Sequence, residues 1–300
     1  MALGLEQGVA SVVHLEKGRG NSCAVKRAAS FAIDESLMKP SFDSRNIDNP
    51  AQLAAVIREL AASAGLLKQK RWSLTLPEAT TRTLLLTMDS ASQSSAETQE
   101  VLRWKMERGF GAPLEELSVS REKLEKDSQG RDRYLAIATR TDVLAEYERL
   151  LASIGWRAGL IVPRHLGESQ WLVRNGSSGD SLLLSGSTGG FTAVILRNGH
   201  PLIVRTVSCS QQDCEDEFYR VLLFYRDRRS GDSAEAPSAL TRLMVVGDGL
   251  SSTRAGEIVN ETTGGNLQPL DAEGVGLLLP GRDLSFDVIA APAGLATLSF

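Results

Sequence analysis

The sequence contains few cysteines, few histidines and few aromatic residues. Its 300 residues include three cysteines and three histidines, and 5% are aromatic. A small, odd number of cysteines is typical of reduced thiols in a reducing compartment and argues against a disulfide framework. Cys209 and Cys214 are close in sequence, but His200, the nearest histidine, has no partner at the spacing of a zinc site. We therefore expect no metal centre.

Long apolar runs and concentrated positive charge are also missing. No apolar stretch approaches the roughly 20 residues that a helix needs to span a bilayer. The opening MALGLEQGVASVVHLEKG has no basic start ahead of an uninterrupted apolar core, so it does not read as a signal peptide. The net charge is −4 and no basic stripe stands out, which argues against a nucleic-acid partner. We expect a cytoplasmic protein.

The remaining composition is ordinary for a soluble globular protein. Hydrophobic residues make up 42% of the chain and charged residues 23%. A chain of this length buries a sizeable core and is typical of two domains, or of one domain with a large insertion.

The N-terminal part predicts a β-hairpin and then a helix. Apolar residues recur from Leu3 to Leu15, and a turn over Gly18–Asn21 precedes the second strand, CAVKRAASFAI. Asn49 and Pro50 suit the cap and the first position of a helix. Apolar residues at helical spacing follow, and Gly65 ends the helix.

A compact α+β unit is predicted between residues 71 and 156. RWSLTL and TTRTLLLTM are typical of strands, and SAETQEVLRWKMERGF of a helix with one buried face. Strands follow at 117–124 and 134–139, joined by the polar turn EKDSQGRD, and a helix covers 143–154 with Gly155 as its stop. We interpret the unit as an insertion.

The second half begins after a polar break over 172–181. SLLLSGSTGGFTAVILRNGHPLIVR, residues 181–205, predicts strand, glycine turn, strand, hairpin and strand. Asn198–Gly199 fits a type I′ turn, which needs positive φ at both positions. A helix, a polar loop over 229–239, the buried strand in LTRLMVVGDGLSS and the helix TRAGEIVNETTGG complete this half.

Three glycine turns, each after a strand, form the candidate site. Two of them, at 6–11 and 185–190, close the hairpins that open the two halves, and the third, at 247–249, precedes a helix. Backbone N–H groups in such turns can cradle a phosphate. The order resembles the actin, sugar-kinase and Hsp70 superfamily, in which two hairpins grip the phosphates of ATP and the third turn packs against the adenosine. The candidate nucleotide-binding residues are Glu6, Gly8, Val9, Ala10, Ser185, Gly186, Ser187, Thr188, Gly189, Gly190, Gly247, Asp248 and Gly249.

A closer resemblance covers nearly the whole chain. TLLLTMDSASQSSAETQEVLRWKMERGFGAPLEELSVSREKL and RYLAIATRTDVLAEYERLLASIGWRAGLIVP resemble PilM-like proteins of type IV pilus assembly. Leu102–Trp104, Pro113 and Glu115–Glu116 match the IRWE helix, the proline turn and the EE motif of that family. DEFYRVLLFYRDR, LMVVGDGLSSTRAGEIVNETTG and VIAAPAGLA are similar to its later helix, its adenosine-side segment and its closing helix. The actin-like part of GspL and the division protein FtsA are architectural relatives.

The resemblance implies an α/β, actin-like (RNase H-like) fold of two domains with an inserted α+β module of SHS2 type. Domain I would comprise residues 1–70 and 157–175, the module 71–156, and domain II 176–300.

The resemblance also implies a non-enzymatic cytoplasmic scaffold, peripheral to the inner membrane, in a type IV pilus or related type II secretion platform. Its partner would be the N-terminal peptide of a PilN-like inner-membrane protein, bound in a groove between the module and the N-terminal subdomain. Membrane contact would run through that partner, and self-association stays open. The implied cofactor is ATP or ADP with magnesium, bound weakly or not at all.

The phosphate turns depart from those of the family. Its first turn reads roughly D-I-G-S-S-S, whereas here Glu6 replaces the Asp and hydroxyls are fewer. Its second turn starts with an Asp, whose place here falls on Leu184 or Ser185. Magnesium with a triphosphate needs hard oxygen ligands or the waters they hold. The sequence therefore predicts a degenerate phosphate turn, no catalytic residue and no efficient hydrolysis.

Two alternatives remain at this point. One is an active ATPase or small-molecule kinase of the same superfamily, which the missing acid disfavours. The other is an FtsA-like filament protein, which a C-terminal amphipathic helix would favour, whereas the apolar tail GLATLSF is short.

Overall fold

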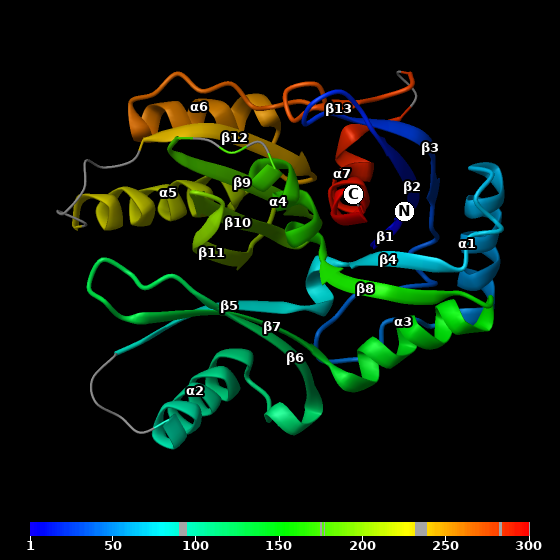
Figure 1. Ribbon diagram of the computed structural model, residues 1–300, viewed down its shortest axis with the longest axis horizontal. Coiled ribbons are helices and arrows are strands. Elements are labelled where there is room, and N and C mark those ends of the chain that lie inside the picture. The colour runs from blue at the N-terminus through cyan, green and yellow to red at the C-terminus, as the bar shows by residue number, and fades with distance from the viewer. Residues whose placement is uncertain (90–94, 175, 177, 232–238, 282–283, 300) are drawn as a thin grey trace.

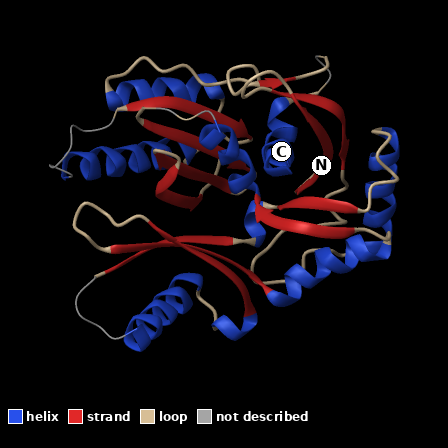
Figure 2. Cartoon of the chain, in the orientation of Figure 1, coloured by secondary structure: helices blue, strands red, loops and turns tan. Residues whose placement is uncertain are grey.

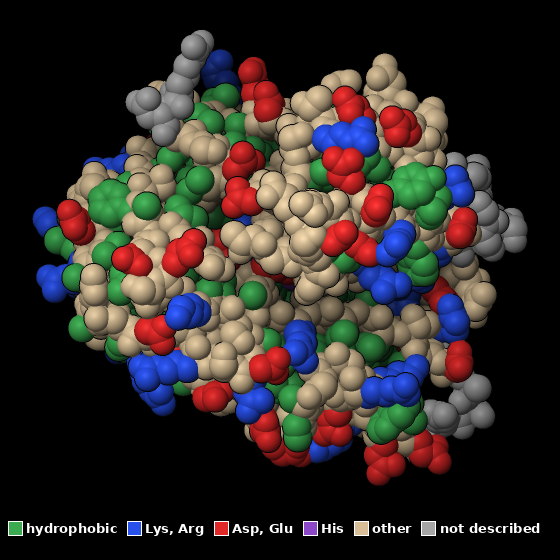
Figure 3. Space-filling view, turned by 180° about the vertical axis from the view of Figure 1, so that it is seen from behind, with side chains coloured by type: hydrophobic (Ala, Val, Ile, Leu, Met, Phe, Trp, Pro, Cys, Tyr) green, Lys and Arg blue, Asp and Glu red, His purple; other side chains and the backbone are tan. Residues whose placement is uncertain are grey.

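The chain forms three β-sheets with helices against them. The computed structural model describes residues 1–89, 95–174, 176, 178–231, 239–281 and 284–299. The sheets have six, four and three strands (Figures 1 and 2). No helix in these ranges is long and apolar enough to cross a membrane. On the face seen in Figure 3, acidic and basic side chains are interspersed rather than segregated.

The strands are β1 (Ala2–Glu6), β2 (Val9–Lys17), β3 (Cys23–Ala32), β4 (Arg71–Leu76), β5 (Arg82–Met88), β6 (Leu117–Leu124), β7 (Asp132–Arg140), β8 (Arg157–Pro163), β9 (Asp180–Ser187), β10 (Gly190–Arg197), β11 (His200–Ser208), β12 (Leu240–Gly247) and β13 (Leu277–Leu278). The helices are α1 (Pro50–Ser63), α2 (Ser95–Phe110), α3 (Thr141–Ser153), α4 (Arg164–Arg174), α5 (Cys214–Gly231), α6 (Ser252–Thr263) and α7 (Phe286–Ala296). Short 3₁₀ turns lie at η1 (Glu78–Thr80), η2 (Leu114–Glu116) and η3 (Thr297–Ser299).

The six-stranded sheet has the order β13-β3-β2-β1-β4-β8 and buries both faces. Successive side chains of a strand point to opposite faces. Leu3 of β1 therefore packs with Ile57 of α1 and Tyr147 of α3, whereas Ala2 packs on the other side with Ile289 of α7. Because helices cover both faces of this sheet, residues on both sides of its first strands are apolar, as the sequence shows.

The four-stranded sheet has the order β11-β10-β9-β12. Leu184 of β9 packs with Phe218 of α5 and Ile258 of α6 on one face. Leu183, its neighbour, packs on the other face with Trp171 of α4. Both faces are buried, which explains why β9 and β12 read as continuous apolar runs rather than as alternating ones.

Helices α4 and α7 lie between these two sheets and share one apolar core with both. The two helices approach each other closely because glycines face across the contact. A Cβ on Gly294 would lie 2.0 Å from the carbonyl oxygen of Gly167, and a Cβ on Gly167 would lie 2.5 Å from that of Ala291. This middle layer fixes one sheet relative to the other.

The third sheet, β5-β7-β6, carries α2 on one face (Figure 1). Phe42, from the loop after β3, belongs to its core, with the Arg82 guanidinium 4.1 Å above the ring. β4 and Tyr147 of α3 belong to the six-stranded sheet and its core, and β13 pairs there with β3. The unit over 71–156 thus shares its two ends with the first sheet, and the predicted domain boundaries stay predictions.

Several local signals act as the sequence predicts. Asn49 caps α1, its Oδ1 accepting a hydrogen bond from the N–H of Gln52 at 3.1 Å, and Pro50 opens the helix. Gly65 has a φ of 67°. Asn198 and Gly199 have φ values of 52° and 79°, as a type I′ turn requires.

Among the helices and strands, β8, α4 and β13 were not expected from the sequence. Helix α4 follows β8 directly at Pro163, so no cap residue marks its start. Its interior holds Gly167, and no clean apolar stripe predicts a helix there. The polar loop expected over 229–239 lies mostly outside the described residues.

Candidate functional site

Two hairpin turns meet at the candidate site. The turn Gln7–Gly8 joins β1 to β2, and the turn Thr188–Gly189 joins β9 to β10. The hydroxyl of Thr188 donates a hydrogen bond to Oε1 of Gln7 at 3.2 Å. The structure thus brings together the first two of the three predicted turns, from opposite halves of the chain.

The strand register of the two hairpins corrects the position in the second turn at which the family's Asp is missing. Glu6 pairs with Val9 and Ser187 pairs with Gly190, so each hairpin closes with a two-residue turn. Ser187 therefore corresponds to Glu6, rather than Leu184 or Ser185. The Ser187 hydroxyl donates to the carbonyl oxygen of Gly190 at 3.3 Å. The second hairpin presents a hydroxyl where the first presents a carboxylate.

The third turn packs against the second through glycine backbones. Gly247 of β12 pairs with Gly186 of β9. A Cβ on Gly186 would lie 1.7 Å from the carbonyl oxygen of Asp248, and a Cβ on Gly247 would lie 2.2 Å from that of Gly186. The hollow that these turns form with Leu184 has no room for a water-sized sphere. These glycines are thus required by strand packing.

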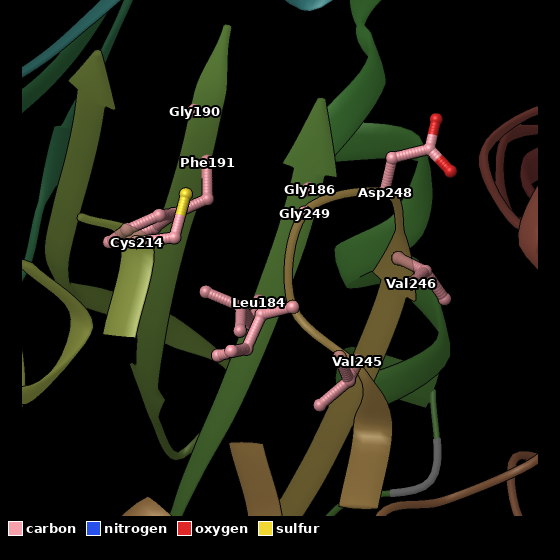
Figure 4. A pocket seen from close by; sticks show the side chains of 10 residues that line it. Leu184, Gly186, Gly190, Phe191, Cys214, Val245, Val246, Asp248 and Gly249 are labelled. Atoms are coloured by element: carbon pink, nitrogen blue, oxygen red, sulfur yellow. The ribbon is translucent and has the colours of Figure 1, made fainter. Parts of the chain in front are cut away.

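Other predicted site residues differ in how open their surroundings are. No atom lies within 4 Å of a Cβ built on Gly8 or Gly189, whereas one on Gly190 would lie 2.0 Å from the carbonyl oxygen of Val207. Asp248 points away from the hollow (Figure 4). The other members lie as follows: Ala10 is in the core of the first sheet, Val9 is partly buried opposite Glu6, Gly249 has a φ of 101°, and the Ser185 hydroxyl is buried with no hydrogen-bond partner among the described residues.

A buried ion-pair cluster that the sequence did not reveal lies beside the turns. Nε of Arg164 donates to Oε1 of Glu168 at 2.7 Å, and Nη1 lies 3.5 Å from Oε2 of Glu6. The guanidinium also reaches the third turn, because a Cβ on Gly247 would lie 2.5 Å from Nη2. The i, i+4 spacing of Arg164 and Glu168 is the one signal that could have indicated this pair. One cation therefore contacts both β1 and the third turn.

A second buried cluster joins α4 to η1 and β10. Nδ1 of His165 lies 2.7 Å from Oε1 of Glu78, and the Thr192 hydroxyl donates to that same oxygen at 2.7 Å. Nε2 of His165 lies 3.3 Å from the hydroxyl of Thr83 at the start of β5. Each of the three sheets or its flanking turns contributes to this cluster. No local pattern in the sequence indicates it.

The charges in both clusters are set by competition between burial and pairing. Burial alone would lower the pKa of His165 and raise that of Glu78, but their attraction outweighs it, so the pKa of His165 is raised and that of Glu78 is lowered. Burial raises the pKa of Glu6, with Arg164 acting in the opposite direction. Burial also opposes the charge of Arg164, yet Glu168 and Glu6 raise its pKa.

The two hairpin turns offer few free oxygen ligands to a magnesium nucleotide. Glu6, the one acid in the two hairpin turns, is paired with Arg164, and Gly186 is covered by the backbone of Asp248. No group of three or more histidine, cysteine, aspartate or glutamate side chains in the described ranges is arranged to hold a metal ion. Metal-bound triphosphate needs free oxygen ligands and open space at the turns.

Comparison with known proteins identifies the fold. No model of a protein family matches the chain, and no curated protein matches its sequence. The chain is similar to a solved structure described as the PilM–PilN type IV pilus biogenesis complex, with a TM-score of 0.72 and 18% identity over 99% of this chain and 97% of the other. A Bacteroides thetaiotaomicron protein with an actin-like ATPase fold and unknown function gives 0.50 and 12%, over 99% and 94%.

A third structure is the cytoplasmic domain of EpsL, an inner-membrane component of the type II secretion system of Vibrio cholerae. It gives a TM-score of 0.49 at 10% identity, over 100% of this chain and 94% of the other. The first two comparisons confirm the predicted fold class, and the first confirms the structural resemblance to PilM-like proteins. The chain has an actin-like, two-domain α/β fold.

Proposed function

We propose that this protein is a non-enzymatic scaffold of a pilus or secretion assembly, with a nucleotide site that is out of use. The observation that carries the proposal is the pairing of Arg164 with Glu6 and Glu168 beside the glycine turns. The actin-like fold and its similarity to a PilM–PilN structure support the choice of assembly. A pilus and a type II secretion platform both remain within the proposal.

The charges beside the glycine turns disfavour catalysis. In an actin-like ATPase the turns must receive a metal ion and a polyanion, so oxygen ligands have to be free. Here the guanidinium of Arg164 contacts Glu6, and its approach to Gly247 brings a permanent positive charge to the third turn. The guanidinium of Arg164 thus supplies positive charge at the place where a bound metal ion would supply it. The second turn adds no acid, because Ser187 and Thr188 carry only hydroxyls.

The second part of the proposal concerns the partner. The protein binds the short N-terminal peptide of a PilN-like inner-membrane protein. The similarity of its fold to that of a PilM–PilN complex supports a partner of this kind. The peptide lies between the inserted module and the N-terminal subdomain. The protein is then held at the cytoplasmic face of the inner membrane through that partner, without a membrane segment of its own in the described ranges.

Calorimetric titration with ATP and magnesium, alongside a phosphate-release assay, tests the nucleotide part. We expect no phosphate release and no binding tighter than about 100 μM. Gly189→Asp is the informative variant, because it adds a negative charge at an open turn. Any genuine phosphate binding at the turn would weaken in this variant. If the parent protein releases phosphate steadily and Gly189→Asp abolishes that release, the scaffold proposal is wrong and the protein is an active ATPase.

The partner is tested separately by fluorescence anisotropy. Labelled peptides from the cytoplasmic start of single-span membrane proteins encoded beside this one are titrated with the protein. We expect one of them to bind and its scrambled version not to bind. If no such peptide binds better than its scrambled form, the scaffold proposal fails even where the nucleotide result agrees with it.

A further inference from the structure

A cavity of about 500 Å³ lies between the inserted three-stranded sheet and the four-stranded sheet. Its walls are residues 81–85, leading into and along β5, and residues 202–206 of β11, with Gly109, Phe224 and Arg228 at the sides. This volume is within the roughly 300–1,000 Å³ of binding pockets. We name it the β5–β11 groove. Figure 1 shows the two strands side by side at facing edges of their sheets.

The run of lining residues shows which part of each strand faces the groove. Successive side chains of a strand point to opposite faces, so a cavity against one face is lined by every second residue. Here five consecutive residues on each side line it. The groove therefore lies along the strand edges, where backbone N–H and C=O groups face outward. Within the described residues, β5 pairs with β7 alone and β11 with β10 alone.

The charged side chains that line the groove are all positive. Arg82, Arg205 and Arg228 line it, and no described lining residue is acidic. Arg82 is paired with Asp43 at 2.9 Å. Arg205 stacks over the half-exposed ring of Phe224, 5.0 Å from its centre, and neither it nor Arg228 forms an ion pair with a described residue. Within the part of the chain that the structure describes, two arginines thus lie without an acidic partner beside an apolar ring and two strand edges that have no further strand.

We propose that the β5–β11 groove binds an extended, acidic segment of a partner protein by strand addition. The partner's backbone pairs with β5 or β11, its acidic side chains meet Arg205 and Arg228, and an apolar side chain contacts Phe224. Five residues of strand span roughly 16 Å, the length offered by each wall. This site is distinct from the one proposed above for the membrane peptide, and it engages β11 rather than the N-terminal subdomain.

Selection from a random ten-residue peptide library displayed on phage, with the intact protein as bait, tests the proposal. We expect enriched sequences to alternate acidic and apolar residues. Synthetic versions should lose at least about tenfold in affinity for the double variant Arg205→Glu/Arg228→Glu. Arg220→Glu, on an exposed position of the same helix as Arg228, is the matched control and should bind like the parent. The peptide affinity should also fall as salt rises.

A second measurement separates strand addition from charge attraction. The selected peptide is resynthesised with alternate backbone nitrogens methylated, which removes N–H donors and keeps every side chain. Loss of binding supports strand pairing. Four outcomes would each overturn the proposal. Two concern the selection: enrichment of basic or uncharged sequences, and no enrichment. The other two concern affinity: equal binding of the methylated peptide, and equal affinity for the double variant. If the parent protein dimerises and the double variant does not, the occupant of the groove is a second copy of this chain instead. None of these outcomes bears on the nucleotide or membrane-peptide tests.

Discussion

His165 on α4 and Glu78 on η1 form a buried ion pair, with Nδ1 2.7 Å from Oε1, although 87 positions separate them in the chain. The hydroxyl of Thr192, on β10 of the other half, donates to the same carboxylate. The pair therefore stabilises the junction at which the inserted module, α4 and the second sheet meet. Because both side chains are buried, their charges are weakly screened and the pair should contribute to the pH dependence of stability.

The first prediction concerns that pH dependence. His165 has a pKa raised above its usual 6.5, so its contribution is full below pH 6.5 and is lost as the pH rises through the folded pKa. Glu78 has a pKa lowered from 4.5, so its contribution is full above pH 4.5 and is lost as the pH falls through the folded pKa. The free energy of unfolding of the parent should exceed that of Glu78→Gln most between about pH 4.5 and 6.5.

The difference inside that window should be about 3 kcal/mol, as for other broken buried pairs, measured by urea unfolding. Glu59→Gln, on the exposed face of α1, is the control. A difference that does not vary between pH 4 and 8 would show that Glu78 and His165 are not paired as ions.

The second prediction concerns Arg164. Arg164→Met leaves the buried Glu168 and the partly buried Glu6 without their cation and should lower the free energy of unfolding by about 3–5 kcal/mol. The double variant Arg164→Met/Glu168→Leu replaces a buried pair with apolar groups of similar size and should recover most of that loss. Chemical denaturation measures both, with Arg174→Met at the end of the same helix as control. A double variant less stable than the single one would contradict the pairing.

The third prediction contrasts two neighbouring glycines. Gly186→Ala puts a methyl group 1.7 Å from the carbonyl oxygen of Asp248 and should cost more than about 2 kcal/mol in the free energy of unfolding. Gly189→Ala meets no atom within 4 Å and should change it by less than about 1 kcal/mol in either direction. Thermal and urea unfolding decide between them. Equal costs would mean that strand packing does not explain the glycine at position 186.

The fourth prediction concerns Cys209, whose sulfur lies 3.0 Å from that of Cys214. Burial and the hydrogen bond with Cys214 raise the pKa of Cys209 to about 12 from 9.0. Alkylation by iodoacetamide at pH 8 should therefore be slower than that of an ordinary exposed thiol by on the order of a hundredfold. Cys214→Ala removes the hydrogen bond and should speed the reaction. Pulse alkylation with mass spectrometry measures both rates, and fast labelling of Cys209 in the parent would contradict the raised pKa.

Local chemistry explains what could be predicted from the sequence. Asn49 with Pro50 specifies a helix start, and Asn198 with Gly199 specifies a turn, because each depends on residues within a few positions. The order of the glycine turns likewise indicated the fold class, which the structural comparisons confirm. The predicted site residues lie on or beside the three glycine turns, and their binding of nucleotide stays a prediction.

The ion-pair clusters could not be predicted, because their members meet only in three dimensions. Glu6 and Arg164 are 158 positions apart, and Arg164 lies on a helix that the sequence did not announce. The position matching Glu6 in the second hairpin depends on strand register, which the pairing of Ser187 with Gly190 settles. A shift of one residue in register changes which side chain ends a strand, and apolar patterning leaves that open near a glycine-rich turn.

The middle layer of α4 and α7 has a consequence for how the chain is made. Val13 of β2 shares its core with Leu295 of α7, so the inner face of the first strands cannot be fully covered until α7 has left the ribosome. At about 5–20 residues per second, translation from one to the other takes roughly 15–60 s. For that interval the nascent chain exposes part of an apolar sheet face, so aggregation competes with folding until synthesis reaches α7.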